Sequence, residues 1–177
     1  FGHGLSYTKF EYSNIKLSKK KIKEGEKLTV TFKLKNVGDR AGAEVAQVYV
    51  CPPKSKIFKA DRELKGFQKV YLEPGEKKKV SIELDERAFS YYNVNIKDWH
   101  AESGEYKIIV AASSRDSKLY EAVEVETTKP DAVVPDYRET AKIYYNVDSM
   151  ASIPASQFEE VLGRPLPNNE EFKKGDL

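Results

Sequence analysis

Apolar and polar residues alternate along this chain in short runs, and this alternation limits the possible fold more than any other feature. Val30, Phe32 and Leu34 are separated by polar residues, so an extended segment here has one apolar and one polar face. The same pattern returns in three other segments, residues 80–84, 106–110 and 123–125. These segments therefore predict half-buried β-strands, with Phe32 and Ile108 in the core.

Three further segments complete the set of expected strands. Residues 43–50 are apolar on both faces except for Glu44 and Gln47, which is typical of a strand in the centre of a sheet. Residues 10–17 and 64–72 are the others. About seven short strands at regular spacing predict an all-β fold, an antiparallel β-sandwich over residues 9–128.

The composition changes near residue 129. Residues 129–177 contain 6 Lys or Arg and 9 Asp or Glu, a net charge of −3, whereas residues 1–128 have a net charge of +5. Pro130 and Pro135 bracket four residues that we expect to form an extended linker. These features indicate an acidic connector or extension that follows the sandwich.

One short helix is expected within this connector, near residues 153–163. Ser156 and Glu159 have the spacing of a capping box, and Gly163 supplies a stop signal. An isolated helix of this length is marginal in water, so its apolar face is expected to dock on a partner surface. That face has i, i+3 and i+4 spacing and consists of Phe158, Val161 and Leu162.

The composition argues against several classes of function. A net charge of +2 gives no indication of a nucleic-acid partner, and no apolar run approaches the roughly 20 residues that span a membrane. Cys51 is the single cysteine, and His3 and His100 are distant in sequence, so a metal site is not expected. We expect no cofactor, no metal, no nucleic acid and no membrane partner.

Lysines gather in two runs, residues 19–23 and 77–79, beside turns or strand starts. Lysines in such places usually solvate a sheet edge and discourage edge-to-edge pairing. A binding site for a polyanion is the alternative interpretation.

Catalytic residues are not evident. Asp85 with Glu86, or Asp98 with Glu102, could form the carboxylate pair of a glycosidase, but pairs of this kind are expected by chance among 28 acidic residues. Trp99, the single tryptophan, either covers one end of the core or is an exposed aromatic that stacks on a sugar ring or a neighbouring domain.

Residues 1–8 read Phe-Gly-His-Gly-Leu-Ser-Tyr-Thr. This segment resembles a signature of glycoside hydrolase family 3 enzymes, chiefly β-glucosidases, at the passage from an α/β sandwich domain into a fibronectin type III-like domain. Three later stretches, residues 43–50, 64–76 and 99–114, resemble that domain in the same order. The resemblance covers residues 1–128 and implies an immunoglobulin/fibronectin type III-like fold.

The resemblance implies little chemistry for this chain. Members of the family are retaining glycosidases whose aspartate nucleophile and glutamate acid/base lie in other domains, so no catalytic residue is carried over. Residues 158–167 also resemble a segment of family members whose domain order is permuted, in which a barrel domain follows.

We therefore expect a non-catalytic accessory module of a β-glucosidase that packs against and stabilises the catalytic domains of the same parent enzyme. Residues 1–8 are expected to be an arm that continues from an upstream domain, and a β-glucoside would be met only through the parent, which we place with slight preference in the cytoplasm. A weak carbohydrate- or polymer-binding module is the alternative. Candidate contacts to a neighbouring domain or a sugar are Phe1, His3, Tyr7 and Trp99.

Overall fold

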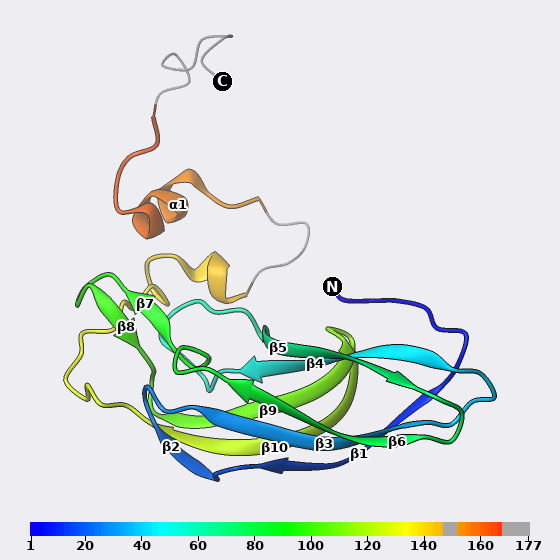
Figure 1. Ribbon diagram of the computed structural model, residues 1–177. Coiled ribbons are helices and arrows are strands. Elements are labelled where there is room, and N and C mark those ends of the chain that lie inside the picture. Colours follow the sequence, from blue (N-terminus) through cyan, green and yellow to red (C-terminus); the bar gives the residue numbers. More distant parts are fainter. Residues whose placement is uncertain (147–151, 168–177) are drawn as a thin grey trace. The chain divides into compact units, whose positions relative to one another are not determined.

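The computed structural model describes residues 1–146 and 152–167, and these residues contain ten strands (Figure 1). Seven strands have eight residues or more and coincide with the seven segments that the sequence predicts. The other three have only three residues each, too few to show an alternating pattern. The predicted β-sandwich is therefore confirmed, with three short strands added to the expected set.

Two sheets form the sandwich. Sheet A has the order β1-β3-β6 and consists of β1 (Phe10–Leu17), β3 (Leu28–Asn36) and β6 (Lys77–Leu84). Sheet B has the order β2-β10-β9-β4-β5 and consists of β2 (Lys21–Lys23), β10 (Asp116–Glu126), β9 (Gly104–Ser113), β4 (Gly42–Cys51) and β5 (Glu63–Leu72). A separate hairpin joins β7 (Tyr91–Asn93) to β8 (Asp98–His100). As predicted, β4 is a central strand, between β9 and β5.

One strand pair differs from the antiparallel arrangement that the sequence predicts. β2 lies parallel to β10, with Ile22 opposite Val125. Residues 18–20 carry the chain from sheet A to sheet B, and β2 continues beside β10 in the same direction. This change of sheet places Ile22, which is 1% exposed, in the core.

The core lies between the two sheets and contains the alternating apolar residues. Phe32 and Ile108 are both fully buried, which confirms the predicted phase of β3 and β9. The same holds for Val80, Ile82 and Leu84 of β6, of which none is more than 6% exposed. Burial of such side chains contributes roughly 1.5–3 kcal/mol each relative to exposure, so the alternation dictates which face of each strand turns inward.

A buried carboxylate ties together the ends of three strands. Glu24, just after β2, has a side chain only 7% exposed. It accepts hydrogen bonds from the backbone N–H of Ala101 (3.0 Å), from Thr127 Oγ1 (2.9 Å), and from the N–H and Oγ1 of Thr128 (2.9 and 3.1 Å). These donors follow β8 and β10, so Glu24 links segments that lie 77 to 104 residues away in sequence.

The chain divides into two compact units. The first comprises Phe1–Ser55 and Lys59–Val133 and contains the sandwich. The second comprises Lys56–Phe58 and Val134–Leu177. In its described part, a 3-10 helix, η1 (Lys142–Tyr145), contacts the segment Lys56–Phe58. Phe58 and Tyr144 form an edge-to-face pair there, with ring centroids 5.7 Å apart.

The expected helix is present in the second unit as α1 (Ala155–Leu162), but its start differs from the prediction. Pro154 occupies the N-cap position without a side-chain hydrogen bond, so Ser156 lies inside the helix and forms no capping box. The Glu159 carboxylate instead accepts a hydrogen bond from the N–H of Leu166, 2.9 Å away. Gly163 ends the helix in the left-handed conformation (φ 73°), as predicted.

Candidate functional site

The N-terminal arm, residues 1–8, forms no strand, yet hydrogen bonds fix its first residues to sheet B. The Ser114 N–H donates to the Phe1 carbonyl (3.0 Å), and the terminal ammonium of Phe1 donates to Ser114 Oγ (3.0 Å). Gln47 Nε2 donates to the Gly2 carbonyl (3.0 Å) and to the Ala112 carbonyl (2.8 Å). The arm is thus attached to the middle of β4 and to the end of β9.

Glycine is required at position 2 for two reasons. Its φ of +68° belongs to the left-handed region that other residues rarely adopt. A Cβ atom at this position would also lie 2.3 Å from Gln47 Oε1. Gln47 is itself fixed, because its Oε1 accepts a 2.6 Å hydrogen bond from the Tyr49 hydroxyl.

The base of the arm is held by a buried amide. Thr8 Oγ1 donates to Asn36 Oδ1 (2.7 Å), and the Asn36 Nδ2 donates to the carbonyls of Arg40 and Leu72 (2.7 and 3.1 Å). A Cβ atom at Gly38 would lie 2.2 Å from Thr8 Oγ1, so the turn after β3 must have a glycine there. Both ends of the arm therefore have defined positions.

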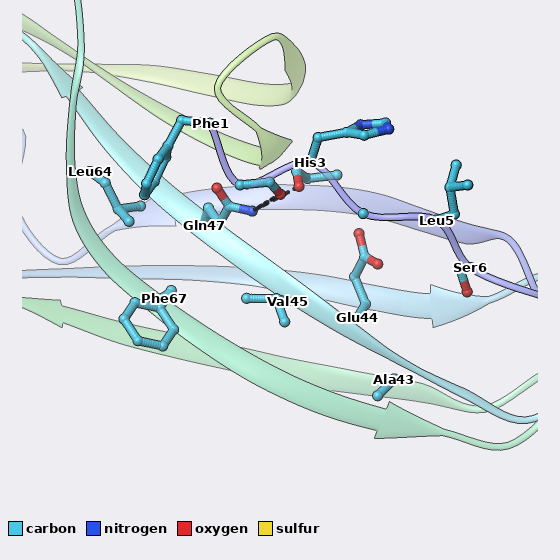
Figure 2. A pocket seen from close by; sticks show the side chains of 13 residues that line it. Phe1, His3, Leu5, Ser6, Ala43, Glu44, Val45, Gln47, Leu64 and Phe67 are labelled. Atoms are coloured by element: carbon cyan, nitrogen blue, oxygen red, sulfur yellow. Dashed lines mark hydrogen bonds between the residues drawn. The ribbon is translucent and has the colours of Figure 1, made fainter.

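A groove of about 470 Å³ lies between the arm and sheet B (Figure 2). Its floor is the outer face of β4 and β5, where Gln47 lies opposite Phe67 in the strand ladder. The lining is mostly apolar and includes Phe1, Leu5, Val45, Leu64 and Phe67. A concave, mainly apolar surface with a few polar groups is typical of a binding site.

One carboxylate borders the groove. Glu44 Oε1 accepts a 2.7 Å hydrogen bond from the Tyr12 hydroxyl of sheet A. Burial raises the pKa of Glu44 and outweighs the opposing effects of the Tyr12 hydrogen bond and the nearby Lys118. Burial and the same hydrogen bond raise the pKa of Tyr12 far above its usual range, so this phenol stays protonated and donating.

Two of the four candidate contact residues meet at this groove. Phe1 and His3 line it, whereas Tyr7 lies on the same arm with its side chain 94% exposed and outside the lining. Trp99 belongs to β8, before the start of β9, whereas Phe1 is bonded to Ser114, just after β9 ends. Trp99 therefore lies at the opposite end of the sandwich.

Trp99 is neither buried over one end of the core nor fully exposed for stacking on a sugar ring or a neighbouring domain. It is 37% exposed, and the Arg87 guanidinium lies 4.7 Å from its ring centroid. Tyr92 contacts its edge with an interplanar angle of 81°. Because Arg87 covers one ring face and Tyr92 is perpendicular, these aromatics do not form the coplanar row that would favour sugar stacking.

Three residues of the groove were not singled out in the sequence. Val45 and Phe67 belong to strands whose register decides which side chains face outward, and that register is not visible in one sequence. Gln47 had a signal, because it interrupts an otherwise apolar central strand. A buried amide must find hydrogen-bond partners, and here the arm supplies one of them.

The described residues contain no group of three or more His, Cys, Asp or Glu side chains with the geometry of a metal site. Of the candidate carboxylate pairs, Asp98 and Glu102 have ion-pair partners: Asp98 pairs with Lys129 (2.7 Å), and Glu102 pairs with Lys59 (2.8 Å). Asp85 accepts a hydrogen bond from the backbone N–H of Arg87 (3.0 Å). Among residues 1–146 and 152–167, no helix is both long and apolar enough to cross a membrane.

A sequence model of the fibronectin type III-like domain matches residues 44–114, which include β4, β5, β6 and β9 of the sandwich. The chain carries a fibronectin type III-like domain. Thermostable β-glucosidase B of Acetivibrio thermocellus is 55% identical over 128 residues, which is 72% of this chain and 17% of the relative. An exo-α-(1→6)-L-arabinopyranosidase of Bifidobacterium breve is 47% identical over 116 residues.

Solved structures extend this comparison. β-Glucosidase 3B of Thermotoga neapolitana in complex with glucose superposes with a TM-score of 0.64 and 45% identity, over 70% of this chain and 17% of that one. A glycoside hydrolase family 3 β-glucosidase of Bifidobacterium adolescentis has a TM-score of 0.69 and 32% identity, over 91% of this chain and 22% of that one. The predicted resemblance to the fibronectin type III-like domain of family 3 β-glucosidases is confirmed.

The chain spans only 15–17% of the length of the curated relatives that it matches. The match to the Bifidobacterium adolescentis enzyme covers 91% of the chain, more than the roughly three quarters that precede residue 134. That similarity therefore continues beyond the fibronectin type III-like domain into the second unit.

Proposed function

We propose that this chain is a non-catalytic accessory module of a β-glucosidase, and that its arm and the outer face of β4 and β5 pack against the catalytic domains of the same polypeptide. The relatives are much longer enzymes in which the matching segment is a small part. Packing against those domains stabilises their arrangement.

The exposure of the arm carries this proposal. Within the arm, Gly2 and Thr8 have partners in the sandwich, as described above. Phe1, Leu5 and Tyr7, by contrast, are 81%, 95% and 94% exposed. A contiguous exposed apolar surface marks an interaction site, and the groove continues this one onto Phe67, which is 67% exposed.

A complementation experiment tests the packing. The β-glucosidase of Acetivibrio thermocellus, with its own matching segment removed, is mixed with this chain, and its thermal unfolding midpoint is measured. We expect the chain to raise the midpoint. The double substitution Leu5→Ser and Tyr7→Ser should abolish the increase, whereas Tyr92→Ser, an equally polar change on the distant hairpin, should not. Loss of the increase with Tyr92→Ser alone would contradict the proposal.

The chain by itself is expected to hydrolyse no aryl β-glucoside. The described acidic clusters form ion pairs and hydrogen bonds, and none of the candidate carboxylates lines the groove. The measurement is release of nitrophenol by the purified chain, with Asp98→Ala as the control for a contaminating activity. Turnover that disappears in Asp98→Ala would show that the chain is itself catalytic and would contradict the accessory role.

A further inference from the structure

The outer face of sheet A concentrates positive charge on two neighbouring strands. In the β3–β6 ladder, Lys33 lies directly opposite Lys79, and Lys35 lies directly opposite Lys77. These residues alternate with the buried Phe32 and Leu34 and therefore face away from the core. Like charges directly opposite each other in a ladder are destabilising, so the arrangement opposes folding.

Most lysines on this face have no ion-pair partner, although Glu11 of β1 lies directly opposite Lys35 in the β1–β3 ladder. Five lysines of the region have no carboxylate oxygen within 4.0 Å among the described residues, namely Lys16, Lys33, Lys35, Lys77 and Lys79. Nearby, at the ends of the same strands, Lys27 pairs with Glu83 (2.8 Å) and Lys78 pairs with Glu76 (3.1 Å). The unpaired lysines are therefore a local feature of this face, which we call the lysine face.

A second hollow of the first unit lies on the lysine face. Its volume is about 390 Å³, and three of the unpaired lysines, Lys16, Lys33 and Lys79, line it. Asn14, Ser18, Thr29 and Thr31 also line it and supply hydroxyl and amide groups.

A β-bulge shapes one wall of this hollow. The register of β1 against β3 shifts between Ser13 and Lys16, and Asn14 in the bulge has a φ of 59°. No side-chain hydrogen bond of Asn14 is present among the described contacts, so its amide is free to meet a ligand. Bulges often occur where a strand directs a side chain to a binding site.

We propose that the lysine face binds an acidic sugar unit of a uronic-acid oligosaccharide. Lys33 and Lys79 bind the carboxylate, while Thr31 and Asn14 accept and donate hydrogen bonds to the sugar hydroxyls. Lys35 and Lys77, two residues further along each strand, attract the carboxylate of a neighbouring sugar. A ligand carboxylate between opposed lysines offsets their mutual repulsion. The like-charge pairs, which are unfavourable in the free protein, would then contribute to ligand binding.

The mixed lining favours a charged sugar over a simpler anion. Leu17 and Phe32 also line the hollow, and this apolar part of the lining suits the C–H face of a sugar ring, which a phosphate lacks. A volume of about 390 Å³ is also that of a small-molecule site, larger than one inorganic anion requires. The site is separate from the apolar groove, which lies on sheet B.

The probe is the tetramer of galacturonic acid, and its methyl ester is the matched neutral ligand with the same ring and hydroxyls. Binding to the 177-residue chain is measured by titration calorimetry at low salt. We expect the acid to bind and the ester to bind at least tenfold more weakly. The affinity for the acid should fall as salt increases, because charge pairs at an exposed face are screened.

Two double variants with equal loss of charge locate the site. Lys33→Gln with Lys79→Gln should weaken binding about tenfold or more, the equivalent of one good charged contact. Lys54→Gln with Lys69→Gln, which removes two exposed lysines outside this face, should leave binding unchanged. Equal loss in both variants would show attraction by net charge only and overturn the proposal.

Folding is followed in the same variants. Lys33→Gln with Lys79→Gln should raise the thermal unfolding midpoint, since it removes a repulsive pair, so weaker binding cannot be attributed to unfolding. Tetraphosphate, a short DNA strand and an acidic peptide serve as other polyanions. If any of them binds as tightly as the tetramer and with the same dependence on Lys33 and Lys79, the assignment to an acidic sugar is wrong.

Discussion

Two polar residues interrupt the apolar strand β4, and both turn out to connect separate parts of the molecule. Gln47 bonds to the arm and to β9, and Glu44 bonds to Tyr12 of the opposite sheet. Burying an amide or a carboxyl without a partner costs several kcal/mol. A polar residue in a central strand therefore indicates a partner, although it does not reveal which one.

The core position of Phe32 leads to a stability prediction. Phe32 is fully buried and stacks with Tyr12 at 6.0 Å between ring centroids, so Phe32→Ala should cost roughly 3–5 kcal/mol of unfolding free energy. Phe67→Ala is the matched control, because Phe67 is 67% exposed on the outer face. Chemical denaturation measures the unfolding free energy of both variants. Equal midpoints for Phe32→Ala and the unchanged chain would show that the phase of β3 is wrong.

Gly2 allows a prediction about the arm. In Gly2→Ala, the new methyl group collides with Gln47 and the backbone has to leave the left-handed region, so the arm should detach. The Ser114 amide, which donates to the Phe1 carbonyl, should then exchange its hydrogen faster. Gly4→Ala is the control, since a Cβ atom at Gly4 meets nothing within 4 Å. Unchanged exchange at Ser114 in Gly2→Ala would mean that the arm is not fixed there.

At the scale of elements, hydrogen bonds from a single side chain can fix short strands that the strand ladders hold only weakly. β2 pairs with β10 over only three residues, and β8 belongs to a separate two-stranded hairpin. Short elements of this kind have too few ladder bonds to hold their place. The four hydrogen bonds to Glu24 join the end of β2 to segments that follow β8 and β10, so one carboxylate fixes three loop segments.

Glu24 makes this connection sensitive to pH. Burial alone would raise its pKa, but the hydrogen bonds from Thr128, Thr127 and Ala101 outweigh burial and hold the pKa below the ordinary value of 4.5. A carboxyl whose pKa is lowered on folding stabilises the fold above its unfolded pKa. That contribution is lost as the pH falls through the folded pKa.

The variant Glu24→Gln should therefore be less stable at pH 7 by about 1–3 kcal/mol, because its amide group donates where an acceptor is needed. The difference from the unchanged chain should be constant above about pH 5 and shrink below pH 4.5. Urea denaturation over pH 3–8 measures this difference in unfolding free energy. Glu124→Gln on the outer face of β10 is the control. A difference that is independent of pH would exclude a charged Glu24.

At the scale of the whole chain, the two units differ in how much apolar surface they bury. The sandwich has a continuous apolar core, whereas α1 keeps Phe158, Val161 and Leu162 about two-fifths exposed. The helix itself is present as expected, whereas the docking of its apolar face remains a prediction. The domain boundary at residue 128 and the connector role of residues 129–177 also remain predictions.

Truncation tests that boundary. A chain that ends at Thr128 contains every strand of both sheets and should unfold cooperatively with an unchanged β-sheet circular dichroism spectrum. It lacks the Lys129–Asp98 ion pair and the 2.9 Å bond from Asn93 Nδ2 to the Val133 carbonyl. A chain that ends at Val133 retains both and should melt at a slightly higher temperature. If the shorter chain does not fold, the later residues belong to the core and the connector role must be dropped.

The sequence alone determined the seven long strands, the inward faces of β3, β6, β9 and β10, and the helix of the second unit. Alternation over eight or more residues fixes the buried face of a strand, because a shift of one residue would expose every apolar side chain. Residues 1–8 carried part of the resemblance to family 3 β-glucosidases, and the structure adds local contacts for Gly2 and Thr8. The capping interpretation of Ser156 failed because Pro154 began the helix two residues earlier.

The tertiary structure decided what lies next to what. The pairing of β2 with β10, the partners of Glu24 and the groove under the arm join residues up to 113 positions apart, and no local pattern encodes such distances. The lysine runs show the same division. The sequence placed residues 77–79 at a strand start, but only the register of β6 against β3 brought Lys79 opposite Lys33 and made a charged face from separate segments.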